Sequence, residues 1–209
     1  MTGEGPLVEA ARTAGVRDAR VLEAMRTVRR RGFVPPGYES SAEVDEPVPI
    51  PHQQVTTQPT LSARMVEALA LSGDEHVLEV GTGYGYQTAL LATLARHVTS
   101  IDCWADLVEQ ARRNLAGAGI RNVTLIVGDG TEGVPSAAPY DAILVSAAFP
   151  DVPEPLVEQL RVDGRLVQPI GPGGHDEVTL FIRTADGLVE QERIVPARFV
   201  RLTGKHGYA

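Results

Sequence analysis

From residue 61 onward, short apolar segments alternate with longer segments whose apolar residues recur at helical spacing. The apolar segments, which we expect to be strands, are 76–80, 97–101, 123–127, 142–146 and 165–170. The helical pattern falls on 62–71, 86–95, 105–115 and 152–160. Continuous apolar strands separated by helices are typical of a parallel sheet that is buried on both faces. The pattern therefore predicts an α/β fold with a doubly wound, Rossmann-like sheet.

The last part of the chain departs from this alternation. Two segments suited to strands, 178–184 and 188–195, flank the dipeptide Asp186-Gly187. Asp-Gly readily adopts the positive φ angles that a tight hairpin turn requires. We therefore expect a terminal antiparallel hairpin at the end of the sheet.

The first part of the chain reads as a helical cap. Helical spacing covers 7–15 and 18–28, with Asp18 as the N-cap of the second helix. The loop at 39–59 is long for a structureless connection, and such loops are often functional. We divide the chain into a cap with a substrate loop, residues 1–60, and a core, residues 61–209, which form one compact unit.

Composition narrows the classes of partner and compartment. The net charge of −8 argues against nucleic acid, because phosphate binding needs a basic surface. No apolar run approaches the roughly 20 residues of a membrane span, and residues 1–11 lack the basic start of a signal peptide. The single cysteine, Cys103, fits a reducing compartment. We expect a cytoplasmic monomer that binds neither membranes nor nucleic acid.

Neither the arginine cluster nor the scattered histidines suggest further chemistry. We interpret the arginines at 26, 29, 30 and 31 as a solvated helix end, where cations are favourable. His52 either contacts a carboxylate or, as we favour, is a solvated loop residue. The other histidines have no acidic or cysteine partner at metal-ligand spacing, so we predict no metal site.

Three features at successive strand ends predict a nucleoside pocket. Gly81, Gly83 and Gly85 follow the first core strand and let the backbone approach a ligand closely. Asp102 ends the next strand, where a carboxylate accepts hydrogen bonds from ribose hydroxyls, and Asp129 follows the third, within reach of an adenine amino group. A helix cap or solvated turn explains either carboxylate alone. Because no P-loop lysine accompanies them, the set indicates a nucleoside without phosphates, such as S-adenosylmethionine.

Several motifs together resemble the protein-L-isoaspartate O-methyltransferase family. They are Phe33-Val34-Pro35, Pro49-Ile50, Thr57-Gln58-Pro59, the segment VLEVGTGYGYQTALL at 77–91, Gly128-Asp129-Gly130, APYDAI at 138–143, GRLVQPIG at 164–171, and Arg198-Phe199-Val200 with Leu202. The match runs in order from Arg29 to Thr203. The resemblance implies a class I methyltransferase fold and an enzyme that uses S-adenosylmethionine on isoaspartyl or aspartyl carboxylates of a protein or peptide.

The resemblance also implies which residues form the site. Segment 55–58 lines the methyl-transfer site, Thr57 provides a catalytic hydroxyl where the family usually has serine, and Leu202-Thr203 folds back near the cofactor. The expected cofactor-binding residues are Val55, Thr56, Gln58, Glu79, Gly81, Thr82, Gly83, Gly85, Asp102, Cys103, Asp129, Gly130 and Thr203. Cys103 is either a pocket wall or plain packing, and Trp104 either packs on adenine or makes an ordinary apolar contact.

The predicted substrate strip departs from the family pattern. Family members carry a run such as Gly-x-Gly-Gln-Thr-Ile-Ser, whereas this chain has Pro51-His52-Gln53-Gln54-Val55-Thr56-Thr57. Two activities therefore stay open: general repair of isoaspartyl residues, and methylation of one aspartate in a dedicated, constrained precursor peptide. In both, the methyl ester collapses to a succinimide. Outside the family, a small-molecule methyltransferase and a non-catalytic peptide-binding protein remain as alternatives.

Overall fold

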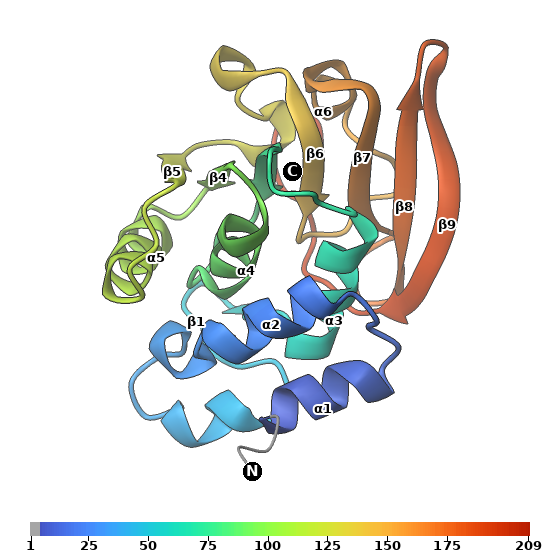
Figure 1. Ribbon diagram of the computed structural model, residues 1–209. Helices are drawn as coiled ribbons and strands as arrows, with labels where there is room; N and C mark the ends of the chain where they lie inside the picture. Colours follow the sequence, from blue (N-terminus) through green and yellow to red (C-terminus); the bar gives the residue numbers. More distant parts are fainter. Residues whose placement is uncertain (1–4) are drawn as a thin grey trace.

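The computed structural model describes residues 5–209 and contains a seven-stranded sheet in the order β5-β4-β3-β6-β7-β8-β9 (Figure 1). Its strands are β3 (His76–Val80), β4 (His97–Asp102), β5 (Val123–Val127), β6 (Tyr140–Val145), β7 (Leu160–Ile170), β8 (Asp176–Thr184) and β9 (Gly187–Ala197). The first five are parallel, and β8 and β9 continue the sheet as antiparallel strands. The predicted doubly wound sheet with a terminal hairpin is confirmed.

The helices lie where the apolar spacing predicts them, with ends that differ by a few residues. They are α1 (Pro6–Thr13), α2 (Ala19–Thr27), α3 (Pro59–Ala68), α4 (Tyr86–Leu94), α5 (Ala105–Gly117) and α6 (Glu154–Gln159). Short 3-10 helices are η1 (Arg30–Phe33), η2 (Glu39–Glu43), η3 (Gly130–Glu132) and η4 (Pro135–Ala137). No described helix combines the length and apolar character needed to cross a bilayer.

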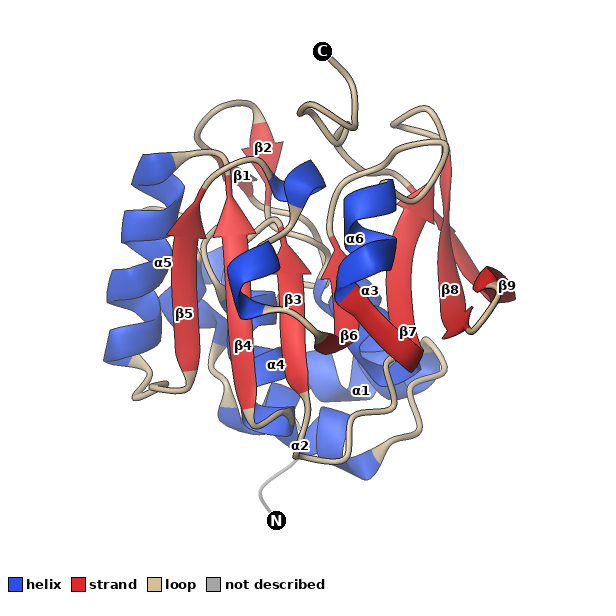
Figure 2. Ribbon diagram, turned by 90° about the horizontal axis from the view of Figure 1, so that it is seen from above, coloured by secondary structure: helices blue, strands red, loops and turns tan. Residues whose placement is uncertain are grey.

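Side chains of the central strands alternate between two hydrophobic clusters. Helices α1 to α4 cover one face of the sheet and α6 covers the other (Figure 2). In β3, Val77 belongs to the cluster that contains residues of α1 to α4, and Leu78 belongs to the cluster that contains Leu156 of α6. In β6, Leu144 and Ile143 divide in the same way. Successive strand residues face opposite sides of a sheet, so an apolar residue at every position means burial on both faces. This is why the strands read as continuous apolar runs.

Strand β7 begins earlier than the predicted 165–170. Its first residues include exposed, polar side chains at Arg161 and Asp163, so they lack the apolar signal of a buried strand. The pairing with β6 is also irregular, because Tyr140 pairs with Leu160 and Ala142 pairs with Arg165. Because these residues are polar and the pairing contains a bulge, the hydrophobic pattern does not predict the start of this strand.

The N-terminal helices pack into the same cluster as the core. Asp18 caps α2 by accepting a hydrogen bond from the Arg20 amide, at 2.7 Å, as predicted. Leu7 and Leu22 share a hydrophobic cluster with Leu90 of α4. The division at residue 60 stays a prediction. Residues 1–4, which open the predicted cap and the stretch without a signal-peptide pattern, lie outside the described residues.

Candidate active site

A cavity of about 530 Å³ lies at the carboxyl ends of the central strands. Its walls are the loop after β3, the end of β4, the segment after β6, a two-stranded ribbon and the C-terminal segment. The ribbon pairs β1 (Pro49–Ile50) with β2 (Gln54–Val55). Ligands of open α/β sheets bind where strand order reverses. Here that point is β3, whose neighbours β4 and β6 lead to opposite sides of the sheet.

Glycines shape the loop between β3 and α4. Gly81, Gly83 and Gly85 have φ angles of 98°, 53° and 87°, which side chains with a Cβ rarely adopt. A Cβ at Gly81 would lie 3.2 Å from the Ser146 Cβ, and one at Gly85 would lie 3.3 Å from the Ala111 Cβ. Glycine at these positions therefore lets the loop pack closely against Ser146 and Ala111 while it lines the cavity.

Asp102 connects the end of β4 to the glycine loop. Its carboxylate accepts hydrogen bonds from the Gly83 amide, at 2.9 Å, and from the Trp104 amide, at 3.1 Å. Burial raises the pKa of this carboxyl group. A carboxylate has about four acceptor positions. Asp102 can therefore hold the loop in place and still accept bonds from ribose hydroxyls in the cavity that it lines.

Glu79 lies behind the glycine loop and does not line the cavity. Its fully buried carboxyl group accepts hydrogen bonds from the Thr88 and Ser100 hydroxyls, at 2.5 and 2.6 Å, and from the Gln87 amide group at 3.3 Å. The Ser100 hydroxyl is also 2.6 Å from the hydroxyl of Thr82. Burial raises the pKa of Glu79 to about 7. In the structure its carboxyl group supports the loop through these hydrogen bonds.

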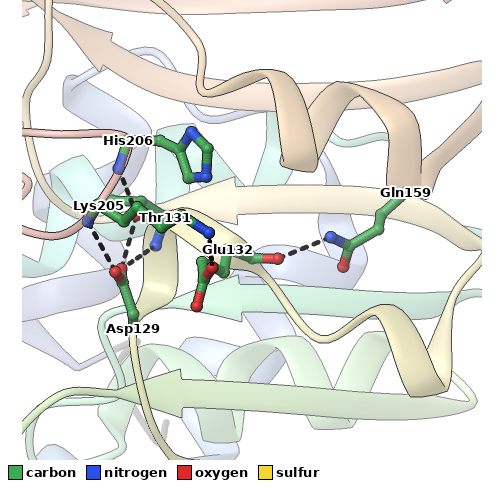
Figure 3. Close-up of polar contacts among 6 residues, drawn as sticks. All are labelled: Asp129, Thr131, Glu132, Gln159, Lys205 and His206. Atoms are coloured by element: carbon green, nitrogen blue, oxygen red, sulfur yellow. Dashed lines mark hydrogen bonds and ion pairs between the residues drawn. The ribbon is translucent and has the colours of Figure 1, made fainter.

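The predicted adenine contact at Asp129 also lies off the cavity wall. The Asp129 carboxylate accepts hydrogen bonds from the amide and hydroxyl of Thr131 and from the amide of Lys205, at 2.8, 2.6 and 2.7 Å (Figure 3). The Thr131 hydroxyl in turn accepts one from the His206 amide. Asp129 thus holds the C-terminal segment, whose Thr203 lines the cavity. The neighbouring Gly130 also lines the cavity.

The substrate strip lines the cavity with Gln54, Val55, Thr56 and Thr57. Thr57 is half-buried, and its hydroxyl makes no hydrogen bond within the described part of the chain. Gln58 points elsewhere, because its amide group donates to Asp45 at 2.8 Å. Gln58, Glu79 and Asp129 are therefore the three predicted site residues that the structure does not place on the wall. The other predicted residues, Gly81, Thr82, Gly83, Gly85, Asp102, Cys103, Gly130 and Thr203, line the same cavity.

The interpretation of the arginine cluster as solvated is wrong for Arg30. This side chain is only 2% exposed and donates to the carbonyls of Ser41, Val44 and Glu46, at 3.2, 2.8 and 2.7 Å. It also donates to the Thr56 hydroxyl at 3.2 Å. The loop carbonyls compensate for part of the cost of burying a cation. Arg30 thereby fixes the position of Thr56, the strip residue that precedes Thr57.

His52 is exposed, as we favoured, and its ring also contacts a carboxylate. Its Nε2 lies 2.8 and 2.9 Å from the two carboxylate oxygens of Asp106, at the start of α5. The ring also lies against Trp104, which lines the cavity. The turn between β1 and β2 is therefore attached to the cofactor side of the cavity.

Pattern reading missed several polar residues on the wall, and three of them have unpaired buried atoms. Ser62 Oγ, Tyr86 OH and Gln87 Oε1 are buried without a hydrogen-bond partner. Ser62 lies near the start of α3, which follows the strip, and Tyr86 and Gln87 begin α4, which follows the glycine loop. A buried polar atom without a partner costs roughly 1–3 kcal/mol. These atoms, the bare glycine loop and Asp102 fit a polar nucleoside ligand such as S-adenosylmethionine.

Comparison with known proteins agrees with this geometry. The model of the Protein-L-isoaspartate(D-aspartate) O-methyltransferase (PCMT) family matches residues 3–207. A protein-L-isoaspartate O-methyltransferase of Methanoregula boonei is 47% identical over 93% of this chain and 89% of its own length. One of Anaeromyxobacter dehalogenans is 50% identical over 90% of this chain and 91% of its own length.

Solved structures show the same fold. A protein-L-isoaspartate O-methyltransferase that is 29% identical aligns with a TM-score of 0.86 over 98% of this chain and 67% of its own. A Plasmodium falciparum structure in complex with S-adenosyl-L-homocysteine aligns with a TM-score of 0.80 at 23% identity, over 97% of this chain and 99% of its own. The chain therefore belongs to the protein-L-isoaspartate O-methyltransferase family, whose members are S-adenosylmethionine-dependent enzymes.

Proposed function

We propose that the chain methylates the carboxylate of isoaspartyl residues in proteins and peptides, as the first step of their repair. The observation that carries this proposal is the position of Thr57. Its unpaired hydroxyl lies on the wall of the same cavity as the glycine loop and Asp102. A group for the acceptor and groups for the methyl donor thus line the same cavity.

The residues that would hold the donor lie around the ends of β3 and β4. Asp102 would accept hydrogen bonds from the ribose, and the backbone of Gly81 to Gly85 would pass along the amino-acid part. Cys103 and Gly130 would enclose the base, and Thr203 would cover it from the C-terminal segment. When bound, S-adenosylmethionine supplies an electrophilic methyl group and leaves as a neutral thioether.

Thr57 is the proposed catalytic residue. An isoaspartyl carboxylate is ionised at neutral pH, so no general base is required. The enzyme has to align a carboxylate oxygen with the methyl carbon and exclude water. The Thr57 hydroxyl would donate a hydrogen bond to one carboxylate oxygen and leave the other free to attack.

The methyl ester makes the repair possible, because it converts the carboxylate into a group that can be displaced. It can expel methanol when the nitrogen of the following residue attacks, and the resulting succinimide hydrolyses to aspartate or isoaspartate. Repeated cycles then convert isoaspartate to aspartate. We also propose that the chain is a cytoplasmic monomer that does not bind nucleic acid, and the net charge of −8 supports the last point.

The alternative of a dedicated precursor peptide depends on the altered strip. Gln53 stands where the family pattern has a glycine, and its φ of 57° is one that glycine adopts easily. Holding a residue with a side chain in this region costs of order 1 kcal/mol. The turn thus keeps a conformation suited to glycine, which favours the general activity over a rebuilt substrate site.

Repair is tested by following one isoaspartyl peptide through many turnovers with excess S-adenosylmethionine. We expect the isoaspartyl peptide to disappear while the aspartyl peptide of the same sequence accumulates, as separated by liquid chromatography. An isoaspartyl peptide that stays unchanged while an aspartyl peptide is converted to isoaspartate would support the dedicated enzyme instead.

A further inference from the structure

Two of the described residues that line the cavity carry a charge, Asp102 and Arg201. They stand on different sides of β3. Asp102 ends β4, whereas Arg201 forms a bridge with Ala148, after β6, and lies against the loop after β7. The Asp102 carboxylate already accepts a hydrogen bond from the glycine loop. Arg201 is the cation among the described lining residues, and it lies on the β6 side of the cavity.

The structure holds the Arg201 side chain in a defined place. Its Nε donates to the Pro172 carbonyl at 3.1 Å, and its guanidinium lies 4.8 Å from the centroid of the Tyr208 ring. The aliphatic part passes so close to Gly173 that a Cβ there would lie 2.6 Å from the Arg201 Cγ. The Tyr208 ring in turn packs edge-on against Phe149, with centroids 5.1 Å apart. An exposed arginine with these contacts loses little further freedom when it binds a ligand.

The outer part of this guanidinium has no anionic partner. No carboxylate of the described residues forms an ion pair with Arg201, although the protein carries a net charge of −8. The two terminal nitrogens can form the fork that matches a carboxylate. An unpaired arginine at the mouth of a cavity in an acidic protein is placed to select an anion.

We propose that Arg201 is a specificity-determining residue that binds an acidic side chain next to the isoaspartyl residue of the substrate. This inference rests on the proposed function. The reacting carboxylate is a poorer candidate, because an ion pair with arginine would stabilise the ground state of the nucleophile and slow its attack. The exposed position of Arg201 instead suits a neighbouring side chain that remains outside the reaction.

The test compares three isoaspartyl peptides that differ at one position beside the isoaspartyl residue, which is Glu, Gln or Lys. For the wild type we expect kcat/KM to be about three- to fivefold higher for Glu than for Gln, as for a partly exposed ion pair, and lowest for Lys. The Arg201→Gln variant should bring the Glu-to-Gln ratio close to one. High salt should also reduce the ratio in the wild type, because it screens exposed charges.

Arg198→Gln is the matched control. It removes the same charge from the same exposed segment but lies off the cavity wall, so the ratio should keep its wild-type value. Loss of the ratio in both variants would mean a general charge effect and would overturn the assignment to Arg201. A second pair, Tyr208→Phe and Tyr208→Leu, tests the ring beneath the guanidinium. The first should keep the ratio and the second should lower it.

Calorimetry of S-adenosylhomocysteine binding tests whether Arg201 binds the carboxylate of the methyl donor instead of one on the peptide. If Arg201→Gln weakens that binding and leaves the peptide ratio unchanged, Arg201 binds the donor's amino-acid carboxylate and the inference is wrong. Turnover of all three peptides at equal kcat/KM by the wild type would also contradict it. Failure of the wild type to methylate any isoaspartyl peptide would instead contradict the proposed function itself, and this inference with it.

Discussion

The imidazole ring of His52 lies flat on the indole ring of Trp104, with centroids 3.8 Å apart and ring planes within 2° of each other. His52 belongs to the turn between β1 and β2, and Trp104 precedes α5 on the other wall of the cavity. The contact of His52 with Asp106 lowers the pKa of that carboxyl group. The strip that carries Thr57 is thus attached to the side of the cavity where the donor would bind.

Replacing His52 by Ala should release this attachment. We expect the KM for S-adenosylmethionine to rise by about two- to fivefold, the range of one stacking contact together with one surface hydrogen bond. Global stability should change little, because the contact lies at the surface. Initial rates at varied donor concentration give the KM. An unchanged KM in His52→Ala would show that the ring contact does not influence donor binding.

Replacing Arg30 by Met should affect both stability and turnover. The carbonyls of Ser41, Val44 and Glu46 would lose their common donor, and stability should fall by about 2–4 kcal/mol. The kcat should fall as well, because the Thr56 hydroxyl loses a hydrogen bond that fixes the strip at the position of Thr57. Urea unfolding and initial rates measure the two effects.

Arg26→Gln is the control for Arg30. Arg26 is exposed and pairs with Glu23 on the surface, so its loss should leave stability close to that of the wild type. Equal effects of the two variants would show that the buried contacts of Arg30 have no special role.

Thr57→Val keeps the shape of the side chain and removes its hydroxyl. Losing a hydrogen bond to a carboxylate should cost about 1.5–3 kcal/mol, which corresponds to a fall in kcat of roughly 10- to 100-fold. Binding of S-adenosylhomocysteine should be unaffected, and Thr57→Ser should remain active. Full activity in Thr57→Val would remove this hydroxyl from the mechanism.

Glu79 makes stability depend on pH in a defined direction. Burial raises its pKa from 4.5 to about 7, so between these values the folded state binds more protons than the unfolded state. Its contribution is therefore greatest below pH 4.5, decreases as the pH rises to about 7, and is constant above that. The total change is on the order of 3 kcal/mol.

The Glu79→Gln variant should flatten this part of the stability profile. Urea unfolding at several pH values between about 5 and 8 measures the slope for each protein. If the variant kept the wild-type slope, another group would be responsible for the pH dependence.

Features encoded by neighbouring residues were predictable from the sequence. Strand β3, the glycine loop and the carboxylate at Asp102 lie within one strand-turn-helix unit and the next strand, where periodicity and turn chemistry suffice. The hairpin at Asp186 is equally local. These elements supplied both the fold and most of the predicted cavity wall.

What escaped prediction depends on contacts between distant parts of the chain. Arg30 is buried because the loop up to Glu46 folds around it, and nothing in a run of arginines signals that. Asp129 is taken by the amide of Lys205, 76 residues away, although its place at a strand end suits an adenine contact. Tyr86 and Gln87 read as ordinary helix residues, and their unpaired polar atoms become visible only in the folded cavity.

The central claim is tested most directly by mass spectrometry of two short peptides that differ only in aspartate or isoaspartate at one position. Each is incubated with the protein and S-adenosylmethionine, with Thr57→Val as the control enzyme. The account predicts that the wild type adds a methyl group to the isoaspartyl peptide and leaves the aspartyl peptide unmodified. Methylation of the aspartyl peptide alone, or of neither peptide by a protein that binds S-adenosylhomocysteine, would contradict it.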